Sequence, residues 1–252
     1  MKRLFLAFWF FSSSLIAQPK VTIITSVYNA DDYIEHFLKE IAKQSFYSNC
    51  HHLIINANSP GNEERSIANH ACKHPNVEYL RLKFDPGLYA VWNIGIIKAK
   101  ADCIMTANVD DQLDYSAIEN LYNYLQANPE VDLVYGDIYL THEKNSTFAL
   151  CSHKNYFQRL EFSKENLKKD CSPGPHPLWR KSLHEKYGMF DQFFKIYGDL
   201  EMWLRSAYHG AIFKRYPEPL SLFYEGPKTL SHSKDKFHQR KQESKLIAKL
   251  YK

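Results

Sequence analysis

The spacing of apolar positions changes several times along the chain, which predicts strands alternating with helices. Short β-branched or continuously apolar runs predict strands, and apolar positions three or four residues apart, as at Ile34, Phe37 and Ile41, predict amphipathic helices. Clusters of Asn, Gly and Pro separate these segments. The expected strands are residues 21–25, 52–55, 77–82, 101–106 and 131–139, and the expected helices are residues 31–45, 63–74, 87–100 and 116–128.

This alternation predicts an α/β fold in which most strands pair in parallel. A strand that returns through a helix joins its neighbour in parallel by a right-handed crossover. Residues 20–231 contain no internal repeat and no low-complexity linker. We therefore expect one compact domain with an elaborated second half.

Polar side chains gather where three of the expected strands end. They are residues 25–29 after the first strand, 56–59 after the second and 108–111 after the fourth. Ligands of open parallel sheets bind at the carboxyl ends of the strands, so these turns indicate one candidate site.

Asp110 and Asp111 give the most specific chemical signal in these turns. Adjacent carboxylates repel each other unless a cation or hydrogen-bond donors stabilise them. Hard divalent ions take oxygen ligands and bridge to phosphates, and a metal offsets the charge of a departing diphosphate. The same pair before a helix also fits a simple capping turn, so the residues alone leave both interpretations open.

Composition and charge limit the partners. The formal net charge is +4, and the body of the chain has no block rich in Lys and Arg and no helix-turn-helix or zinc-finger spacing, so no nucleic acid is expected. Five cysteines without a CxxC pair indicate neither a zinc site nor a disulfide framework. The aromatic share of 15% suits sugar faces and also ordinary core packing.

The two ends of the chain differ from the domain. Lys2 and Arg3 precede a short apolar run, so residues 1–19 are expected to be a secretory signal or a membrane-anchoring leader outside the fold. Residues 232–252 predict a basic amphipathic helix that either lies on anionic lipid or is a solvated terminal helix.

The order and spacing of several segments resemble family 2 glycosyltransferases. Residues 21–29, Val-Thr-Ile-Ile-Thr-Ser-Val-Tyr-Asn, look like the opening of that family, and residues 56–59 occupy the place of its Asp-Asp-Gly-Ser turn. Residues 85–96 are similar to the segment that ends in its Asn-x-Gly helix, and residues 108–111 match its Asp-x-Asp-Asp region. Residues 176–182, 188–191 and 199–205 look like its acceptor-side segments.

The resemblance implies a GT-A fold, Rossmann-like, with a mostly parallel central sheet and helices on both faces. It implies a nucleotide-binding half, residues 20–111, and an acceptor half, residues 112–231. The implied activity is inverting transfer from a nucleotide diphosphate sugar to a hydroxyl of a glycan or lipid-linked acceptor, in cell-surface polysaccharide synthesis. The implied cofactor is a divalent metal, manganese or magnesium.

The site residues of the family carry over by position. Asp110 would contact the ribose or nucleotide, Asp111 would bind the metal and diphosphate, and Asp199 would be the general base. Asp199 opens an expected helix, so a helix cap is the alternative. The remaining nucleotide-pocket residues would be Thr25, Tyr28, Asn29, Ser59, Asn93 and Asn56, of which Asn56 would face the nucleobase.

Two departures from the family pattern motivate an alternative function. Asn56 and Asn108 stand where relatives have carboxylates. The alternative is a degenerate transferase that binds nucleotide or glycan without turnover. A nucleotidyltransferase is not favoured, because no Gly-rich phosphate loop with a basic residue follows the first strand.

Other residues give weaker indications. His176 fits either a phosphate contact or a satisfied loop histidine, and Trp179 and Trp203 fit sugar stacking or core packing. His232 stands near the place where some relatives close the metal site. Because nucleotide sugars are cytoplasmic, we expect a membrane-associated protein on the cytoplasmic face, with export by a signal peptide as the alternative.

Overall fold

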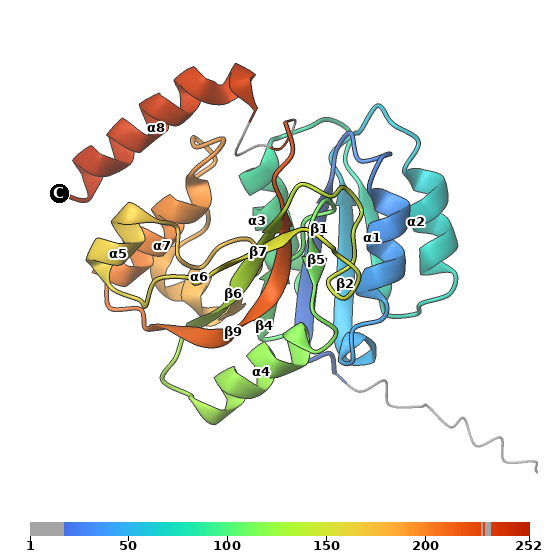
Figure 1. The fold of residues 1–252 in the computed structure, drawn as a ribbon, viewed down its shortest axis with the longest axis horizontal. Helices are drawn as coiled ribbons and strands as arrows, with labels where there is room; N and C mark the ends of the chain where they lie inside the picture. Colours follow the sequence, from blue (N-terminus) through green and yellow to red (C-terminus); the bar gives the residue numbers. More distant parts are fainter. Residues whose placement is uncertain (1–17, 228, 230–232) are drawn as a thin grey trace, which may run out of the picture.

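A nine-stranded sheet forms the centre of the computed structural model, which describes residues 18–227, 229 and 233–252 (Figure 1). The strand order is β3-β2-β1-β4-β8-β6-β9-β5, and β7 pairs with β6. Most of the expected leader, residues 1–17, lies outside the described residues. The first half of the sheet is parallel, as expected, and consists of β1 (Val21–Val27), β2 (Cys50–Asn56), β3 (Val77–Arg81) and β4 (Cys103–Thr106).

The second half adds antiparallel strands that the sequence pattern did not predict. The short β8 (Leu178–Arg180) lies between β4 and β6 (Leu133–Thr141) and is antiparallel to both. The long β9 (Phe213–Tyr224) is parallel to β6 over nine paired positions. The parallel pairings hold most of the paired residues, and the remaining antiparallel strands are β5 (Gln112–Leu113) and β7 (Lys154–Phe157).

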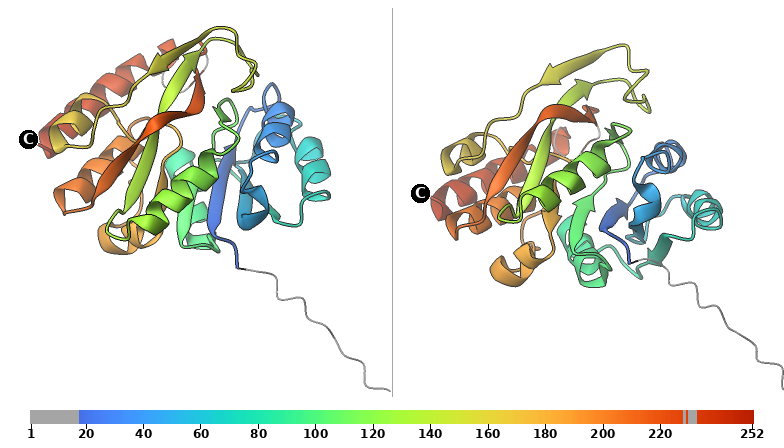
Figure 2. Two further views of the ribbon diagram at one scale, coloured as in Figure 1. Left: turned by 60° about the horizontal axis from the view of Figure 1, so that its bottom comes forward. Right: turned by 90° about the horizontal axis from the view of Figure 1, so that it is seen from below.

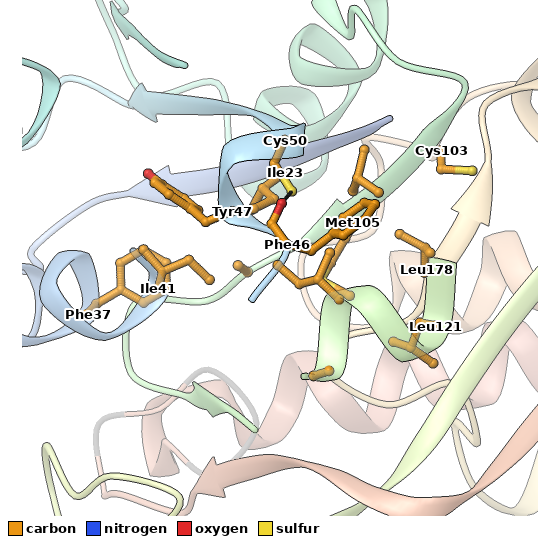
Figure 3. Packing of buried hydrophobic residues seen from close by; sticks show 14 of the residues in the cluster. Ile23, Phe37, Ile41, Phe46, Tyr47, Cys50, Cys103, Met105, Leu121 and Leu178 are labelled. Atoms are coloured by element: carbon orange, nitrogen blue, oxygen red, sulfur yellow. Dashed lines mark hydrogen bonds between the residues drawn. The ribbon is translucent and has the colours of Figure 1, made fainter. Parts of the chain in front are cut away.

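Helices cover both faces of the sheet (Figure 2). Alternation along β1 explains the two layers, since Ile23 packs into one apolar cluster and Ile24 into the other. The first cluster contains residues of α1 (Ile34–Ile41), α2 (Glu64–Ala71) and α4 (Ala117–Ala127). Figure 3 shows Ile23 of β1, Phe37 of α1 and Leu121 of α4 among its members. The second contains α3 (Leu88–Lys98), α5 (Lys164–Lys169), α6 (Ser182–Tyr187), α7 (Gly198–Tyr208) and α8 (Phe237–Leu250).

Two glycines allow the close contacts that place α3. A Cβ on Gly95 would lie 2.7 Å from Ile24 Cγ2, so only glycine lets α3 pack this tightly against β1. A Cβ on Gly198 would lie 2.7 Å from the ring of Tyr89. The first residue of α7 therefore leaves room for Tyr89, which α3 carries to the candidate site.

The C-terminal helix α8 packs against the domain through one face. Ile247 is buried, and the rings of Tyr208 and Tyr251 lie 5.3 Å apart between their centroids. Figure 1 shows α8 on the same side of the molecule as α5 and α7. Across the described residues, no helix has the length and apolar character needed to span a membrane.

Candidate active site

A cleft of about 1200 Å³ lies at the carboxyl ends of β1 and β4. Residues from both halves of the chain line it, which places side chains far apart in sequence around one space. Five of the residues predicted from the sequence are among them: Tyr28, Asn29, Asp110, Asp111 and Asp199.

Asp111 lies at the bottom of the turn that follows β4 and is only 2% exposed. Its Oδ1 accepts a hydrogen bond from the backbone N–H of Tyr224 at 2.9 Å, and its Oδ2 accepts one from Asn108 Nδ2 at 3.0 Å. His176 Nε2 lies 3.9 Å from Oδ2. Burial and the charge of Asp110 raise the pKa of Asp111 well above its usual range.

Asp110 is the more open of the two carboxylates. It is half-buried, it lines the cleft, and burial raises its pKa. No side chain within the described part of the chain donates a hydrogen bond to it. Tyr33 lines the cleft nearby, and burial together with the charges of Tyr224 and Asp110 raises the pKa of Tyr33 to about 12. Asp110 is therefore the more accessible of the two carboxylates from the cleft.

The two carboxylates fit a metal that arrives with its substrate. Over the residues that the structure describes, no three His, Cys, Asp or Glu side chains gather to hold a metal by themselves. Magnesium-like ions are commonly held by one or two carboxylates together with substrate phosphates and water. Burial raises the pKa of both Asp110 and Asp111, and a cation bound beside them would favour their ionised forms.

Asp199 approaches the cleft from the opposite half of the chain, in the first turn of α7. Tyr197 occupies the N-cap position of this helix, and Asp199 is its second residue. The Tyr89 hydroxyl lies 3.1 Å from Asp199 Oδ1, and Cys171 Sγ lies 3.8 Å from Oδ2. Burial raises the pKa of Asp199.

Four predicted site residues are not among the residues that line the cleft, and each makes hydrogen bonds within the protein. Thr25 Oγ1 lies 3.0 Å from His52 Nε2, and Asn56 Oδ1 accepts a hydrogen bond from Ser59 N at 2.7 Å. Ser59 Oγ donates to Glu63 Oε1 at 2.7 Å and accepts from Asn29 N at 2.9 Å.

Asn93, the fourth of these residues, pairs with the backbone of Phe190. Its Nδ2 donates to Phe190 O at 2.8 Å, and its Oδ1 accepts from Phe190 N at 3.0 Å. Asn93 therefore ties α3 to the segment before α7.

The open alternatives for the weaker residues are also answered. His176 is buried with Nδ1 3.0 Å from Ser221 Oγ, as expected of a satisfied histidine. Trp179 and Trp203 pack against each other in the core, with ring centroids 5.4 Å apart, although Trp203 also borders the cleft. His232 lies outside the described residues.

Sequence reasoning missed several cleft residues. Tyr89 and Cys171 contact Asp199, and Arg159 donates to the carbonyl oxygens of Cys171 and Ser172. The Asp-Pro-Gly turn at residues 85–87, which precedes α3, was the available signal for Tyr89. Cys171 and Arg159 gave no signal, because neither belongs to a recognisable spacing.

Comparison with known proteins agrees with this geometry. The pattern of the family described as Glycosyl transferase family 2 matches residues 22–188. The uncharacterized glycosyltransferase YwdF of Bacillus subtilis is 25% identical over 192 residues, which cover 75% of this chain and 68% of that protein. The minor teichoic acid biosynthesis protein GgaB of Bacillus subtilis is 23% identical over 146 residues, covering 57% of this chain and 16% of that protein.

Solved structures share the fold. TarS 1–349 of S. aureus in complex with UDP-GlcNAc superposes with a TM-score of 0.70 and 12% identity, covering 90% of this chain and 66% of that chain. The mannosyltransferase PcManGT of Pyrobaculum calidifontis in complex with GDP-Man and Mn2+ gives a TM-score of 0.64 and 15% identity, covering 84% of this chain and 59% of that chain. The chain thus spans less than two thirds of these solved chains, and their shared architecture confirms the expected GT-A fold. With the family pattern covering more than half of its residues, the chain belongs to glycosyl transferase family 2.

Proposed function

We propose that this chain is an inverting transferase that moves a sugar from a nucleotide diphosphate sugar to a hydroxyl of a glycan or lipid-linked acceptor, in the synthesis of a cell-surface polysaccharide. One observation carries the proposal: Asp110 and Asp199 line one cleft from different halves of the chain. The names of the relatives support it, since solved neighbours hold UDP-GlcNAc or GDP-Man and one relative is a teichoic acid biosynthesis protein.

The nucleotide side of the cleft would be formed by Tyr28, Asn29 and the turn after β4. The metal and diphosphate contact would be made by Asp111, as the family resemblance implies, together with the more exposed Asp110. Each Asp111 carboxylate oxygen accepts one hydrogen bond and keeps a further lone pair. A bound manganese or magnesium ion would act as a Lewis acid that offsets the charge of the leaving diphosphate.

Asp199 would remove the proton from the acceptor hydroxyl as that oxygen attacks the anomeric carbon. Inversion requires the base and the leaving group to lie on opposite sides of that carbon. Tyr89 and Cys171 contact the Asp199 carboxylate and would orient it toward the acceptor hydroxyl. Its burial raises its pKa, which increases its basicity toward a hydroxyl.

A donor screen tests the function directly. The protein is incubated with a panel of nucleotide sugars, with manganese or magnesium, and nucleoside diphosphate release is measured with and without glycan acceptors. We expect release with at least one donor and its loss in Asp110→Asn. No release from any donor, together with thermal stabilisation by nucleoside diphosphate, would instead support the degenerate binding module.

We also propose that α8 rests on an anionic membrane surface at the cytoplasmic face. Its only acid, Glu243, faces inward, whereas Lys241, Lys245 and Lys249 are exposed. Phe237 and Leu250 expose 57% and 56% of their surface at the two ends of the helix. Cationic faces with apolar residues bind anionic lipid.

Vesicle sedimentation tests the membrane contact. We expect binding to phosphatidylglycerol vesicles, no binding to phosphatidylcholine vesicles, and loss of binding when the three lysines are changed to Gln. Equal sedimentation of wild type and triple variant would refute the contact. Recovery of the protein outside the cytoplasmic membrane would favour the alternative, export by a signal peptide.

A further inference from the structure

Glu243 is a buried acid on α8 that the proposed chemistry does not use. It is 5% exposed although α8 is otherwise rich in exposed polar residues. Its two carboxylate oxygens accept hydrogen bonds from three consecutive backbone N–H groups, those of Lys195, Ile196 and Tyr197, at 2.9, 3.0 and 2.9 Å. A carboxylate that accepts three backbone N–H groups fixes the conformation of that segment.

The segment that Glu243 holds leads directly into the candidate base. Residues 195–197 immediately precede α7, and Asp199 is the second residue of that helix. The carbonyl oxygen of Ile196 accepts a hydrogen bond from the Tyr89 hydroxyl at 2.6 Å, and the same hydroxyl lies 3.1 Å from Asp199 Oδ1. Glu243 and Tyr89 therefore contact the same short segment from opposite sides.

The Tyr89 hydroxyl has one proton, for which the Ile196 carbonyl oxygen and Asp199 Oδ1 compete. The position of the Ile196 carbonyl therefore determines the strength of the hydrogen bond from Tyr89 to Asp199. At the observed distances the carbonyl is the nearer acceptor. A shift of Ile196 would change both the orientation of Tyr89 and the hydrogen bonding of Asp199. Displacements of about 1 Å at a reacting group can reduce a rate by about 100-fold.

We propose that Glu243 is a positioning residue for Asp199, so that the C-terminal helix is a working part of the active site and not only a surface attachment. This inference rests on the proposed role of Asp199 as the base. Glu243 touches neither substrate nor reacting atoms, and it acts through the backbone of residues 195–197. The cleft-lining residues Thr229 and Lys236 precede α8, so this helix begins beside the cleft. Glu243 in α8 then hydrogen bonds to residues 195–197, which also line the cleft.

The alternative is that Glu243 only attaches α8 to the domain. Two other residues also attach it: Ile247 is buried in the core, and the Tyr251 hydroxyl donates to Glu201 Oε1 at 2.8 Å. Neither contacts residues 195–197 by a hydrogen bond in the described part of the chain. Ile247 therefore offers a control that weakens the docking of α8 but leaves the Glu243 hydrogen bonds in place.

The test compares the variants Glu243→Gln, Ile247→Ala and Gln242→Ala in the full chain, with an active donor and well below the unfolding temperature. The Gln variant keeps the size of the side chain but replaces one acceptor oxygen with an NH₂ group that faces backbone donors. We expect its kcat to fall about 10- to 100-fold with the KM for the donor within twofold of wild type. Gln242 is exposed, so Gln242→Ala should match wild type.

Hydrogen exchange gives a second readout that does not depend on turnover. The backbone amides of residues 195–197 should exchange faster in Glu243→Gln than in wild type. In Ile247→Ala their exchange rates should equal those of wild type. An unchanged kcat in Glu243→Gln, or an equal loss of kcat in Ile247→Ala, would overturn the inference. Unchanged exchange at these amides in Glu243→Gln would overturn it as well, whatever the donor screen shows.

Failure of the proposed function looks different. If Asp199→Asn keeps full activity, then Asp199 is not the base and the proposed chemistry is wrong. If Asp199→Asn is inactive while Glu243→Gln has wild-type kcat, then only the positioning role fails.

Discussion

Replacing Asp199 with Asn removes the ability of this residue to act as a base but keeps its size and one hydrogen-bond acceptor. The amide keeps the shape of the side chain and an oxygen that can accept the hydrogen bond from Tyr89, which lies 3.1 Å away. It cannot take a proton from an acceptor hydroxyl. A positioned general base contributes about 10²- to 10⁴-fold in rate.

The structure favours the upper end of that range. The other acidic groups beside Asp199 are Tyr89 and Cys171, and burial raises the pKa of each well above its usual value. Neither can replace the carboxylate as a base at neutral pH. We therefore expect kcat to fall about 10³- to 10⁴-fold, which corresponds to roughly 4–5.5 kcal/mol of activation free energy.

The same substitution should not destabilise the fold. Burial raises the pKa of Asp199 in the folded state, so ionisation of this group opposes folding at neutral pH. This cost in folding free energy disappears when the pH falls below the usual pKa of an aspartate carboxyl. The neutral amide in Asp199→Asn carries no such cost, so the unfolding temperature of this variant should equal or exceed that of wild type at pH 7. Nucleoside diphosphate release and thermal unfolding with and without UDP or GDP measure both effects. A variant with more than a tenth of wild-type kcat, or one that no longer binds nucleotide, would refute the assignment.

Three further predictions concern packing, charge and pH. Gly95→Ala places a Cβ 2.7 Å from Ile24 Cγ2 and 2.8 Å from Ile24 Cδ1 and should cost about 1–3 kcal/mol of unfolding free energy in urea melts, with partial recovery in Gly95→Ala/Ile24→Val, which removes Cδ1. Asp137→Asn removes the charge that Arg215 contacts at 2.6 Å in a buried pair, and calorimetry should show a loss of about 3–5 kcal/mol; a loss below about 1 kcal/mol would contradict this. Burial raises the pKa of metal-free Asp110, so a pH series of kcat/KM at manganese concentrations well below saturation should lose activity on acidification above the usual carboxyl range, and an acid limb near about 4 would count against it.

The sequence predicted the first half of the fold well because local patterns specify it. Helices connect the first four strands in sequence, so neighbouring segments determine the parallel pairing of β1 with β2 and of β2 with β3. The pairing of β4 with β1 joins strands that are far apart in the sequence. The position of β8 could not be predicted in this way. Its three residues are too few for a periodicity, and its partners β4 and β6 are set by contacts far apart in sequence.

The candidate site was predicted in outline and not in detail. The sequence placed polar turns at one edge of the sheet, and Asp110 and Asp199 do line one cleft there. It could not show which polar side chains face the cleft, because the same groups also satisfy turn backbone, as Asn56 does for Ser59. The contact of Tyr89 with Asp199 spans 110 positions along the chain, and no local pattern indicates it.

The two asparagines that motivated a degenerate function have different consequences in the structure. Asn108 Nδ2 donates to Asp111 Oδ2 at 3.0 Å, so this amide stabilises the buried carboxylate that lies below Asp110. A carboxylate at position 108 would place a third acidic group beside Asp110 and Asp111, whose pKa values burial already raises. The Asn108 hydrogen bond thus favours the ionised form of Asp111, and the presence of this amide is compatible with catalysis. We expect Asn108→Asp to raise the pH at which kcat/KM is half-maximal and to make the rate depend more steeply on manganese concentration. An unchanged pH profile in this variant would show that position 108 does not influence Asp110 and Asp111.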